Sequence, residues 1–439
     1  MEQIKKIKVA MICHFSTEEV RTHLPLDDRK LYRLVRRFLR LSDKGSGYGD
    51  IAPWDKGIID YFRKRNDIEL YVISAHSGLK RRVCQFDMDG VKYWFIKCDV
   101  ATMLKHIIPS NRLWLKMNPM VPSVRKIINE IKPDIVNLQG NENAYYSSTV
   151  LGLKGYPIYS ICQTIYNNPD RGKYGKVDTI NAFVEREIFK QVKYFGVYCK
   201  MHYDMLRKLS PEAMIFKFGY PGTGKLLQPT PTEKEYDFVN FAMGISDKKG
   251  YYDAVRALAI VKQTYPNVTL NLVGGADDEE MAKIKTCVEE FGVSDNVIFT
   301  PFFPKREDMF LHIQKSRFAL LPCKMDNTSG TMIQAMQLGL PLIVYKTAGT
   351  PAFNKEKECA LIAEHSDVED LAKQMLVYLN EPEHAAHNAV NAREYQERKA
   401  EMAGSNGDRL VENYRAILVN CQNGTAIPQE MLFNPEKDC

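Results

Sequence analysis

The sequence predicts an α/β protein built from two doubly wound domains, each around a mostly parallel sheet. Three observations favour this fold class. The chain has 439 residues, which is too long for one ordinary core. Short apolar runs alternate with segments of helical period, as strands and crossover helices do. A stretch rich in Pro, Gly and Thr, residues 219–236, interrupts this alternation, which then restarts. We therefore expect two cores, each from about 200 residues.

The first half of the chain begins the alternation. Its opening stretch, residues 4–15, is a charged lead into a short apolar run, which has the composition of a buried first strand. Further runs repeat the pattern, and segments of helical period lie between them. Strands are expected in 68–74, 133–140, 156–162 and 194–199, and helices in 56–65, 122–131 and 180–193.

The second half of the chain has a complete alternation of its own. Strands are expected in 237–244, 268–275, 296–302, 317–323, 341–345 and 360–364, and helices in 250–265, 277–292 and 306–316. The chain then turns helical and ends in a helix over 406–418, with Asn406 as its N-cap.

These elements predict the domain boundaries. We expect an N-terminal domain over 1–218, a linker over 219–236, a C-terminal domain over 237–400, and a final segment, 401–439, whose helix packs back on the N-terminal domain. Ligands in open α/β sheets bind at the carboxyl ends of the strands. The cleft between two such domains is therefore the expected site.

Composition limits the classes of partner and the compartment. The net charge of +6, with 26% charged residues, does not match a dedicated nucleic-acid binder. The 10 cysteines include no Cys-x-x-Cys pair, so we expect free thiols and no bound zinc. Neither a signal peptide nor a run of 18 apolar residues is evident, which favours the cytoplasm.

The stretch "MDNTSGTMIQAMQLGLP", residues 325–341, suggests a phosphate site. It follows a predicted buried strand, so its loop opens toward the cleft, and its helix is stopped by Gly339 and Pro341. The small residues 328–330 leave backbone N–H groups accessible in front of a helix N-terminus, where a phosphate is favoured. The alternative is an ordinary strand–loop–helix connection with a Ser or Thr cap.

This stretch also resembles the donor site of retaining glycosyltransferases of the GT-B fold, family GT4. That family has Glu, seven residues and a second Glu, followed by Ala-Met, two residues, Gly, any residue and Pro. The same frame runs here from Asp326 through Gln334 to Pro341, with both acids altered. The resemblance implies that Asp326 binds hydroxyls of the donor sugar. It also implies that Gln334 binds the ribose, with weaker hydrogen bonds than a carboxylate would make.

The start of the same domain extends the resemblance. Lys249-Gly250 matches a Lys-Gly pair that binds the diphosphate in the family, whereas the family's preceding Arg is replaced by Gly244 or Ile245. By resemblance, the backbone near Phe302 and Phe303 contacts the nucleotide base. The alternative for "SDKKG" is a solvated turn. The residues expected at the donor site are therefore Asp326 and Lys249 as catalytic groups, with Gly250, Phe302, Phe303, Asn327, Thr328, Ser329, Gly330, Thr331 and Gln334 as binding groups.

The N-terminal half matches the family only in layout. Polar residues follow two predicted strands, where an acceptor would meet the donor, and none of them is histidine. We expect the acceptor side to include Asn141, Glu142 and Gln163, and a Gly-rich loop with Gly47 and Gly49. The alternatives are that the polar residue Gln163 is an ordinary strand-end group and that the Gly-rich stretch is a flexible surface loop.

Two further segments have competing interpretations. "RKLYRLVRRFLRL", residues 29–41, predicts a helix with a basic face that either contacts an anionic membrane or faces solvent. "DMDG", residues 87–90, contains the Asp-x-Asp of metal-binding glycosyltransferases of another fold. It lies between two strand-like runs and ends in Asp-Gly, so we interpret it as a hairpin turn.

The resemblance implies a GT-B protein, with two Rossmann-like domains facing across a cleft. It implies sugar transfer from a nucleotide-diphosphate sugar to a hydroxyl of a glycan, a lipid-linked glycan or a protein. Configuration would be retained, with no cofactor or metal. Two alternatives remain open: a nucleotide-sugar epimerase, and a non-catalytic subunit that assists a partner glycosyltransferase.

Overall fold

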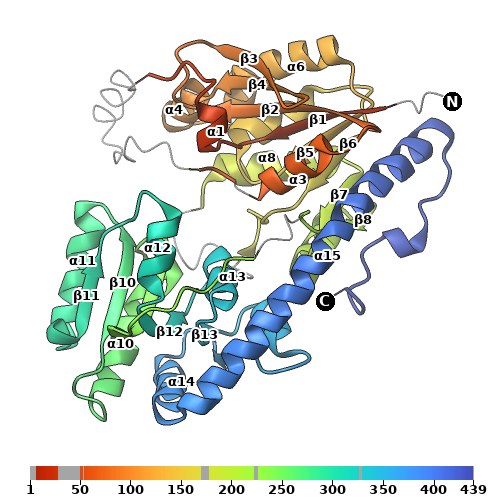
Figure 1. The fold of residues 1–439 in the computed structure, drawn as a ribbon. Coiled ribbons are helices and arrows are strands. Elements are labelled where there is room, and N and C mark those ends of the chain that lie inside the picture. The colour runs from red at the N-terminus through yellow and green to blue at the C-terminus, as the bar shows by residue number, and fades with distance from the viewer. Residues whose placement is uncertain are drawn as a thin grey trace. The chain divides into compact units, whose positions relative to one another are not determined.

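The computed structural model describes residues 6–27, 50–52, 54–169, 177–221, 226–325 and 329–438. The chain divides into two compact units (Figure 1). Unit 1 comprises Met1–Gly224 and Met402–Cys439, and unit 2 comprises Lys225–Glu401. Each unit has its own sheet and its own core, so the predicted fold class of two α/β domains is confirmed.

Unit 1 contains an eight-stranded sheet in the order β3-β4-β2-β1-β5-β6-β7-β8. All its neighbouring strands are parallel except β3 and β4. The strands are β1 (Ile7–Cys13), β2 (Ile68–His76), β3 (Val83–Met88), β4 (Val91–Lys97), β5 (Ile135–Gln139), β6 (Ile158–Ile161), β7 (Tyr194–Val197) and β8 (Met214–Lys217).

The "DMDG" stretch is the turn of the β3–β4 hairpin, as predicted. Met88 pairs with Val91, and the two residues between them have positive φ, +49° at Asp89 and +76° at Gly90. Two consecutive residues of this conformation match the right-handed twist of a hairpin.

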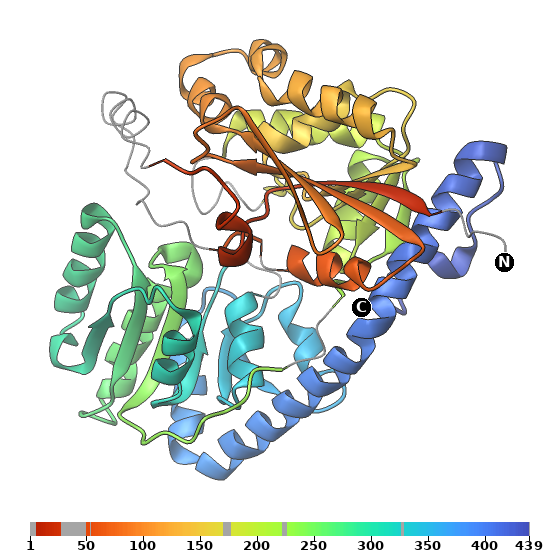
Figure 2. The same cartoon turned by 45° about the horizontal axis from the view of Figure 1, so that its top comes forward.

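Helices cover both faces of the unit 1 sheet (Figure 2). One face packs against α4–α8, and the other packs against α3 and the C-terminal part of α15. The helices are α1 (Glu18–Arg21), α3 (Asp55–Arg63), α4 (Asp99–Ile107), α5 (Asn111–Met117), α6 (Met120–Ile131), α7 (Ala144–Ser147), η1 (Ser148–Gly152), α8 (Thr179–Gln191), α9 (Lys200–Leu209) and η6 (Gln429–Met431). The long helix α15 (Pro382–Asn423) belongs to unit 2 up to Glu401 and to unit 1 from Met402.

Unit 2 contains a six-stranded parallel sheet in the order β11-β10-β9-β12-β13-β14. The strands are β9 (Tyr236–Gly244), β10 (Leu270–Gly275), β11 (Val297–Thr300), β12 (Ser316–Leu321), β13 (Leu342–Tyr345) and β14 (Ala360–Ala363). The helices are η3 (Asp247–Lys249), α10 (Tyr251–Lys262), α11 (Asp278–Glu290), η4 (Ser294–Asn296), α12 (Arg306–Ile313), α13 (Gly330–Gln337), η5 (Thr350–Asn354) and α14 (Val368–Asn380).

The last helix corrects one prediction. Asn406 is not an N-cap, because α15 runs without a break from Pro382 to Asn423. The side chain of Asn406 donates to the carbonyl of Tyr220, at 3.2 Å. A Cβ at the next residue, Gly407, would lie 2.5 Å from the ring of Tyr61. These two residues therefore serve close packing within unit 1 and do not start a helix.

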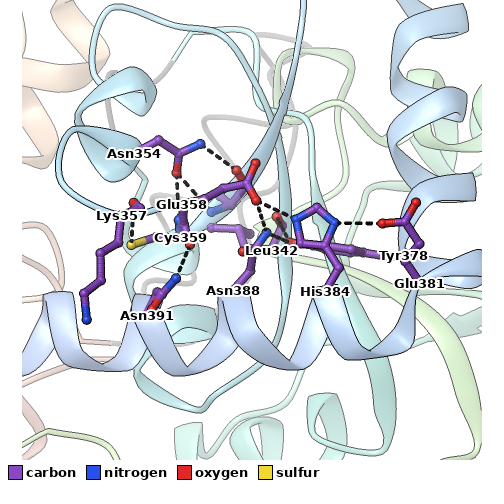
Figure 3. Close-up of polar contacts among 11 residues, drawn as sticks. Leu342, Asn354, Lys357, Glu358, Cys359, Tyr378, Glu381, His384, Asn388 and Asn391 are labelled. Atoms are coloured by element: carbon purple, nitrogen blue, oxygen red, sulfur yellow. Dashed lines mark hydrogen bonds and ion pairs between the residues drawn. The ribbon is translucent and has the colours of Figure 1, made fainter.

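The first turn of α15 is tied to the loop before β14 (Figure 3). His384 Nε2 lies 2.5 Å from Glu358 Oε2, and its Nδ1 lies 3.2 Å from Glu381 Oε2. Asn388 donates to the same Glu358 oxygen at 3.1 Å. The Glu358 hydrogen bond, and then the charge of that carboxylate, raise the pKa of His384 despite some burial.

This contact predicts a pH-dependent contribution to the stability of unit 2. Because the folded pKa of His384 lies above the unfolded value of about 6.5, the contribution is complete below that value and is lost as the pH rises through the folded pKa. His384→Ala should lower the unfolding temperature more at about pH 5.5 than at about pH 9, by no more than about 1 kcal/mol in free energy. His387→Ala, at an exposed position of the same helix, is the control. An equal loss at both pH values would contradict the prediction.

The state of the cysteines and the apolar character of the helices can both be stated for the described residues. Every described cysteine is a free thiol. Among the described helices, none combines the length and the apolar character needed to cross a bilayer.

Candidate functional site

Each sheet has a switch point, where the order of strands reverses along the chain. In unit 1 this point lies between β1 and β5, because β2 lies on the other side of β1. In unit 2 it lies between β9 and β12, because β10 lies on the other side of β9. Loops leave such a pair of strands in opposite directions, and ligands bind in the crevice at their carboxyl ends. The loops that follow these four strands are therefore the candidate ligand-binding loops.

In unit 2, the loop after β9 packs directly against the loop after β12. Gly250 ends η3 and begins α10 with φ of +78°, a conformation that glycine adopts readily. A Cβ on Gly250 would lie 2.1 Å from the carbonyl oxygen of Pro322. The backbone N–H of Lys324 donates to the carbonyl of Lys248 at 3.0 Å. The Lys-Gly pair predicted from the sequence is therefore adjacent to the loop that leads into residues 325–341.

An ion network that runs from the exposed Asp247 to the buried Asp253 fixes the same junction. Lys324 Nζ lies 2.8 Å from Asp247 Oδ1 and 3.0 Å from Asp253 Oδ2. Tyr345 donates to Asp253 Oδ2 at 3.0 Å. Burial opposes the charge of Lys324, but the hydrogen bonds and charges of the two carboxylates outweigh it and raise its pKa. Lys324 thus holds the two loops together, and sequence analysis did not single it out.

The helix after the β12 loop begins as predicted. Ser329 is the N-cap of α13, and its hydroxyl accepts from the N–H of Met332 at 3.3 Å and contacts Thr331 Oγ1 at 2.8 Å. A Cβ on Gly330 would meet no atom within 4 Å, so the first turn is open. Gln334 is half-buried one turn further on. Asp326, Asn327 and Thr328 lie outside the described residues.

Small and apolar residues extend this edge of unit 2 toward β11. Gly275 ends β10, and a Cβ there would lie 3.6 Å from both Phe302 Cβ and the carbonyl of Met243. Phe302 and Met243 are 48% and 76% exposed. Phe303 is partly buried, with its ring 5.1 Å from that of His312. An exposed aromatic ring beside a glycine strand end is a suitable surface for a flat, partly apolar group.

The sequence of unit 2 is similar to that of known proteins. Residues 225–395 match the family model for glycosyl transferases group 1. The match covers most of unit 2, including η3 and α13, and less than half of the chain. An uncharacterized glycosyltransferase of Haemophilus influenzae is 24% identical over 136 residues, which are 31% of this chain and 37% of that protein. The alignment thus spans little more than a third of that relative.

Solved structures resemble this chain over most of its length. Sucrose-phosphate synthase from Thermosynechococcus elongatus has a TM-score of 0.65 at 15% identity, over 93% of this chain and 98% of that one. The Anabaena protein HepE, in complex with UDP and glucose, has a TM-score of 0.60 at 12% identity, over 93% and 100%. At such identities the likeness concerns the fold alone. The fold is therefore GT-B, with two Rossmann-like domains.

In unit 1, the switch point carries a histidine that sequence analysis missed. His14 directly follows β1, its Nδ1 contacts the hydroxyl of Tyr145, and its ring lies edge-on to that of Tyr145. Burial, and then the charge of nearby His76, lower the pKa of His14 to about 4. The sequence signal for His14 was its position near the end of the opening stretch, residues 4–15, which contains the predicted first strand.

The predicted acceptor residues lie around the same end of the sheet. Asn141 and Glu142 follow β5, and Gln163 follows β6. Asn141 is fully buried, and its carbonyl accepts from Ser147 at 3.1 Å. Glu142 lies over Gly140, where a Cβ would be 2.8 Å from both carboxylate oxygens. Gly47, Gly49 and the basic segment 29–41 lie outside the described residues.

Glu185 of α8 is a buried acid with a structural role. Its carboxylate accepts from the backbone N–H groups of Tyr166 and Asn167, both at 2.7 Å, and from Asn167 Nδ2 at 2.7 Å. These bonds shape the segment after β6. Over the described part of the chain, no three His, Cys, Asp or Glu side chains are placed to hold a metal ion.

Proposed function

We propose that the protein is a retaining glycosyltransferase of family GT4. Unit 2 binds a nucleotide-diphosphate sugar, and unit 1 presents an acceptor hydroxyl of a glycan, a lipid-linked glycan or a protein. The observation that carries the proposal is the junction of the β9 and β12 loops at the unit 2 switch point, within the segment that matches group 1 glycosyl transferases. UDP in the Anabaena relative makes a UDP-sugar the first donor to test.

The diphosphate would lie between Lys249 and the first turn of α13. Backbone N–H groups of Gly330 and Thr331 and the positive end of the helix stabilise negative charge as it develops on the departing diphosphate. Gln334 would hydrogen-bond the ribose and Asp326 the donor sugar, while Phe302 and Phe303 flank the base. The leaving phosphate would take the acceptor proton on the face from which the diphosphate departs. Neither a cofactor nor a metal is assigned to this mechanism.

A donor panel tests the proposal. Wild-type protein is incubated with UDP-, GDP-, ADP- and dTDP-sugars, and thermal stabilisation and slow donor hydrolysis are measured. We expect one nucleotide class to do both, with the stabilisation growing with ligand concentration as linkage requires. Free hexose serves as the control. Failure of every donor at millimolar concentration would contradict the proposal and favour a non-catalytic subunit of a transferase pair.

The anomeric outcome and the acceptor require separate readouts. NMR of the released or transferred sugar distinguishes retention from inversion, and product analysis without acceptor reveals an epimerase. Vesicles with and without anionic lipid test contact of segment 29–41 with a membrane. Because lipid-linked acceptors lie at such surfaces, binding to anionic vesicles would support a role in polysaccharide biosynthesis at the inner face of the membrane.

A further inference from the structure

The unit 1 switch point contains a buried carboxyl group that the proposed mechanism does not use. Asp55 is the first residue of α3, the described helix that leads directly into β2, so it lies at the carboxyl end of β1. Its exposed fraction is 0%, and within the described chain neither carboxylate oxygen has a hydrogen-bond partner. A buried polar group without a partner costs about 1–3 kcal/mol. Such a group needs an explanation.

Ordinary structural roles do not account for Asp55. An acid in the first turn of a helix commonly accepts from the free N–H groups there, but neither oxygen of Asp55 does so. Glu185, equally buried in the same unit, shows what a structural carboxylate looks like, because it is held by several N–H donors. Asp55 therefore differs from Glu185 in hydrogen bonding and not in burial.

The surroundings of Asp55 favour its neutral form. Burial, and then the charge of Glu142, raise the pKa of Asp55 well above its ordinary value. Cys13, Tyr146 and Tyr220 also lie within electrostatic range of Asp55, and each is itself held neutral by burial. A neutral carboxyl group has one O–H donor and remaining acceptor capacity. It can therefore donate a hydrogen bond to one hydroxyl group and accept a hydrogen bond from another while it stays neutral.

We propose that Asp55 is an acceptor-binding residue that hydrogen-bonds neighbouring hydroxyls of an uncharged sugar or polyol. The inference rests on the proposed function for its link to transfer, although binding itself does not require it. A phosphorylated ligand is disfavoured, because it would bring negative charge close to Glu142. Among the described residues, no cation acts on Asp55 that could offset this repulsion. Sites built to bond a hydroxyl discriminate strongly, because the buried group is otherwise left unpaired.

Three variants test this role. Asp55→Asn keeps donor and acceptor atoms without charge, Asp55→Leu removes them, and Asp60→Leu makes the same change at a half-buried position of the same helix. Binding of neutral probes (glucose, galactose, mannose, N-acetylglucosamine and myo-inositol) is measured by ligand-observed NMR without donor. Glucosamine and glucose 6-phosphate are the charged comparisons.

We expect at least one neutral probe to bind wild type, glucose 6-phosphate to bind at least about tenfold more weakly, and Asp55→Leu to lose about tenfold or more in affinity. Asp55→Asn should stay within about threefold of wild type, and Asp60→Leu should match wild type. The proposal would be overturned if Asp55→Leu bound the neutral probes as tightly as wild type, or if no neutral probe bound wild type at all. It would also be overturned if glucosamine bound most tightly and Asp55→Asn lost as much affinity as Asp55→Leu.

A stability measurement shows that the variants fold and tests the neutral state. Because the folded pKa of Asp55 is raised, its presence lowers stability progressively as the pH rises from the unfolded pKa of about 3.9 toward the folded value. Asp55→Asn should therefore raise the unfolding temperature more at pH 7.5 than at pH 4. The opposite order would overturn the assignment. The wild-type donor panel reports separately on the proposed transfer, so the two failures are distinguishable.

Discussion

Lys249→Ala is expected to lower the rates of donor hydrolysis and of transfer by about 10²–10³-fold. Lys249 is half-buried in η3, next to the Gly250 turn that packs on Pro322. In the proposed mechanism it is the cation facing the diphosphate, and the family's second basic residue is absent. The only other groups assigned to the diphosphate are the backbone N–H groups at the start of α13, which carry no full charge. Removal of Lys249 should therefore lower kcat as well as weaken donor binding.

The matched control for Lys249 is Lys248→Ala. Both substitutions remove one lysine charge from the same short element, but the side chain of Lys248 is exposed. The contribution of Lys248 to the junction is its carbonyl, which accepts from the N–H of Lys324 at 3.0 Å and survives the substitution. We expect hydrolysis by this variant within about threefold of wild type, since exposed charges contribute little. Equal loss in the two variants, measured with the same UDP-sugar, would contradict the specific role of Lys249.

Gly250→Ala is expected to destabilise unit 2 by roughly 2–5 kcal/mol and to displace the donor loops. Two costs add. A non-glycine residue at φ of +78° is strained, and its Cβ would lie 2.1 Å from the Pro322 carbonyl oxygen, so one of the two loops must move. Lys249 and the residues leading into α13 belong to those loops. Donor binding should therefore fall together with stability.

Gly292→Ala separates these two costs. Gly292 has φ of +65°, but a Cβ there would meet nothing within 4 Å. It should lose only the conformational part, about 1–2 kcal/mol, and keep donor binding. Denaturant unfolding measures the difference in the free energy of unfolding between the two variants. A spectroscopic probe is needed in each unit, because the two units need not unfold together. If the two variants were equally stable, the packing of Gly250 on Pro322 would not carry the expected energy.

Local signals in the sequence were sufficient for most of the fold. Alternating apolar runs located β1, β2, β5–β7 and all six strands of unit 2, because buried parallel strands are nearly continuous in apolar residues. Asp89-Gly90 predicted the hairpin, and Gly339, with φ of +69°, ended α13 where expected. The short edge strand β8 was missed. Among the described residues, its only neighbouring strand is β7, apart from a single bridge between Phe216 and Leu432, and its four-residue pattern is too short to be distinctive.

The α15 helix illustrates where local signals fail. The sequence "GSNG", residues 404–407, has low helix propensity and looks like a break followed by a new cap. The helix continues because tertiary contacts stabilise it. Asn406 donates a hydrogen bond to the Tyr220 carbonyl, and only a glycine at position 407 fits against the Tyr61 ring. Packing thus overrides propensity over one turn.

The sequence by itself determined the two α/β domains, the loops of the unit 2 switch point and the resemblance of those loops to a donor site. Each of these depends on residues close together in the chain. The tertiary structure alone decided that His14 adjoins Tyr145 and that Lys324 joins two loops. It also decided that Asp55 is buried without a hydrogen-bond partner among the described residues, while Glu185 accepts several hydrogen bonds. The burial of a side chain and its electrostatic interactions depend on contacts between segments that are distant in the sequence. A local pattern of residues does not predict those contacts.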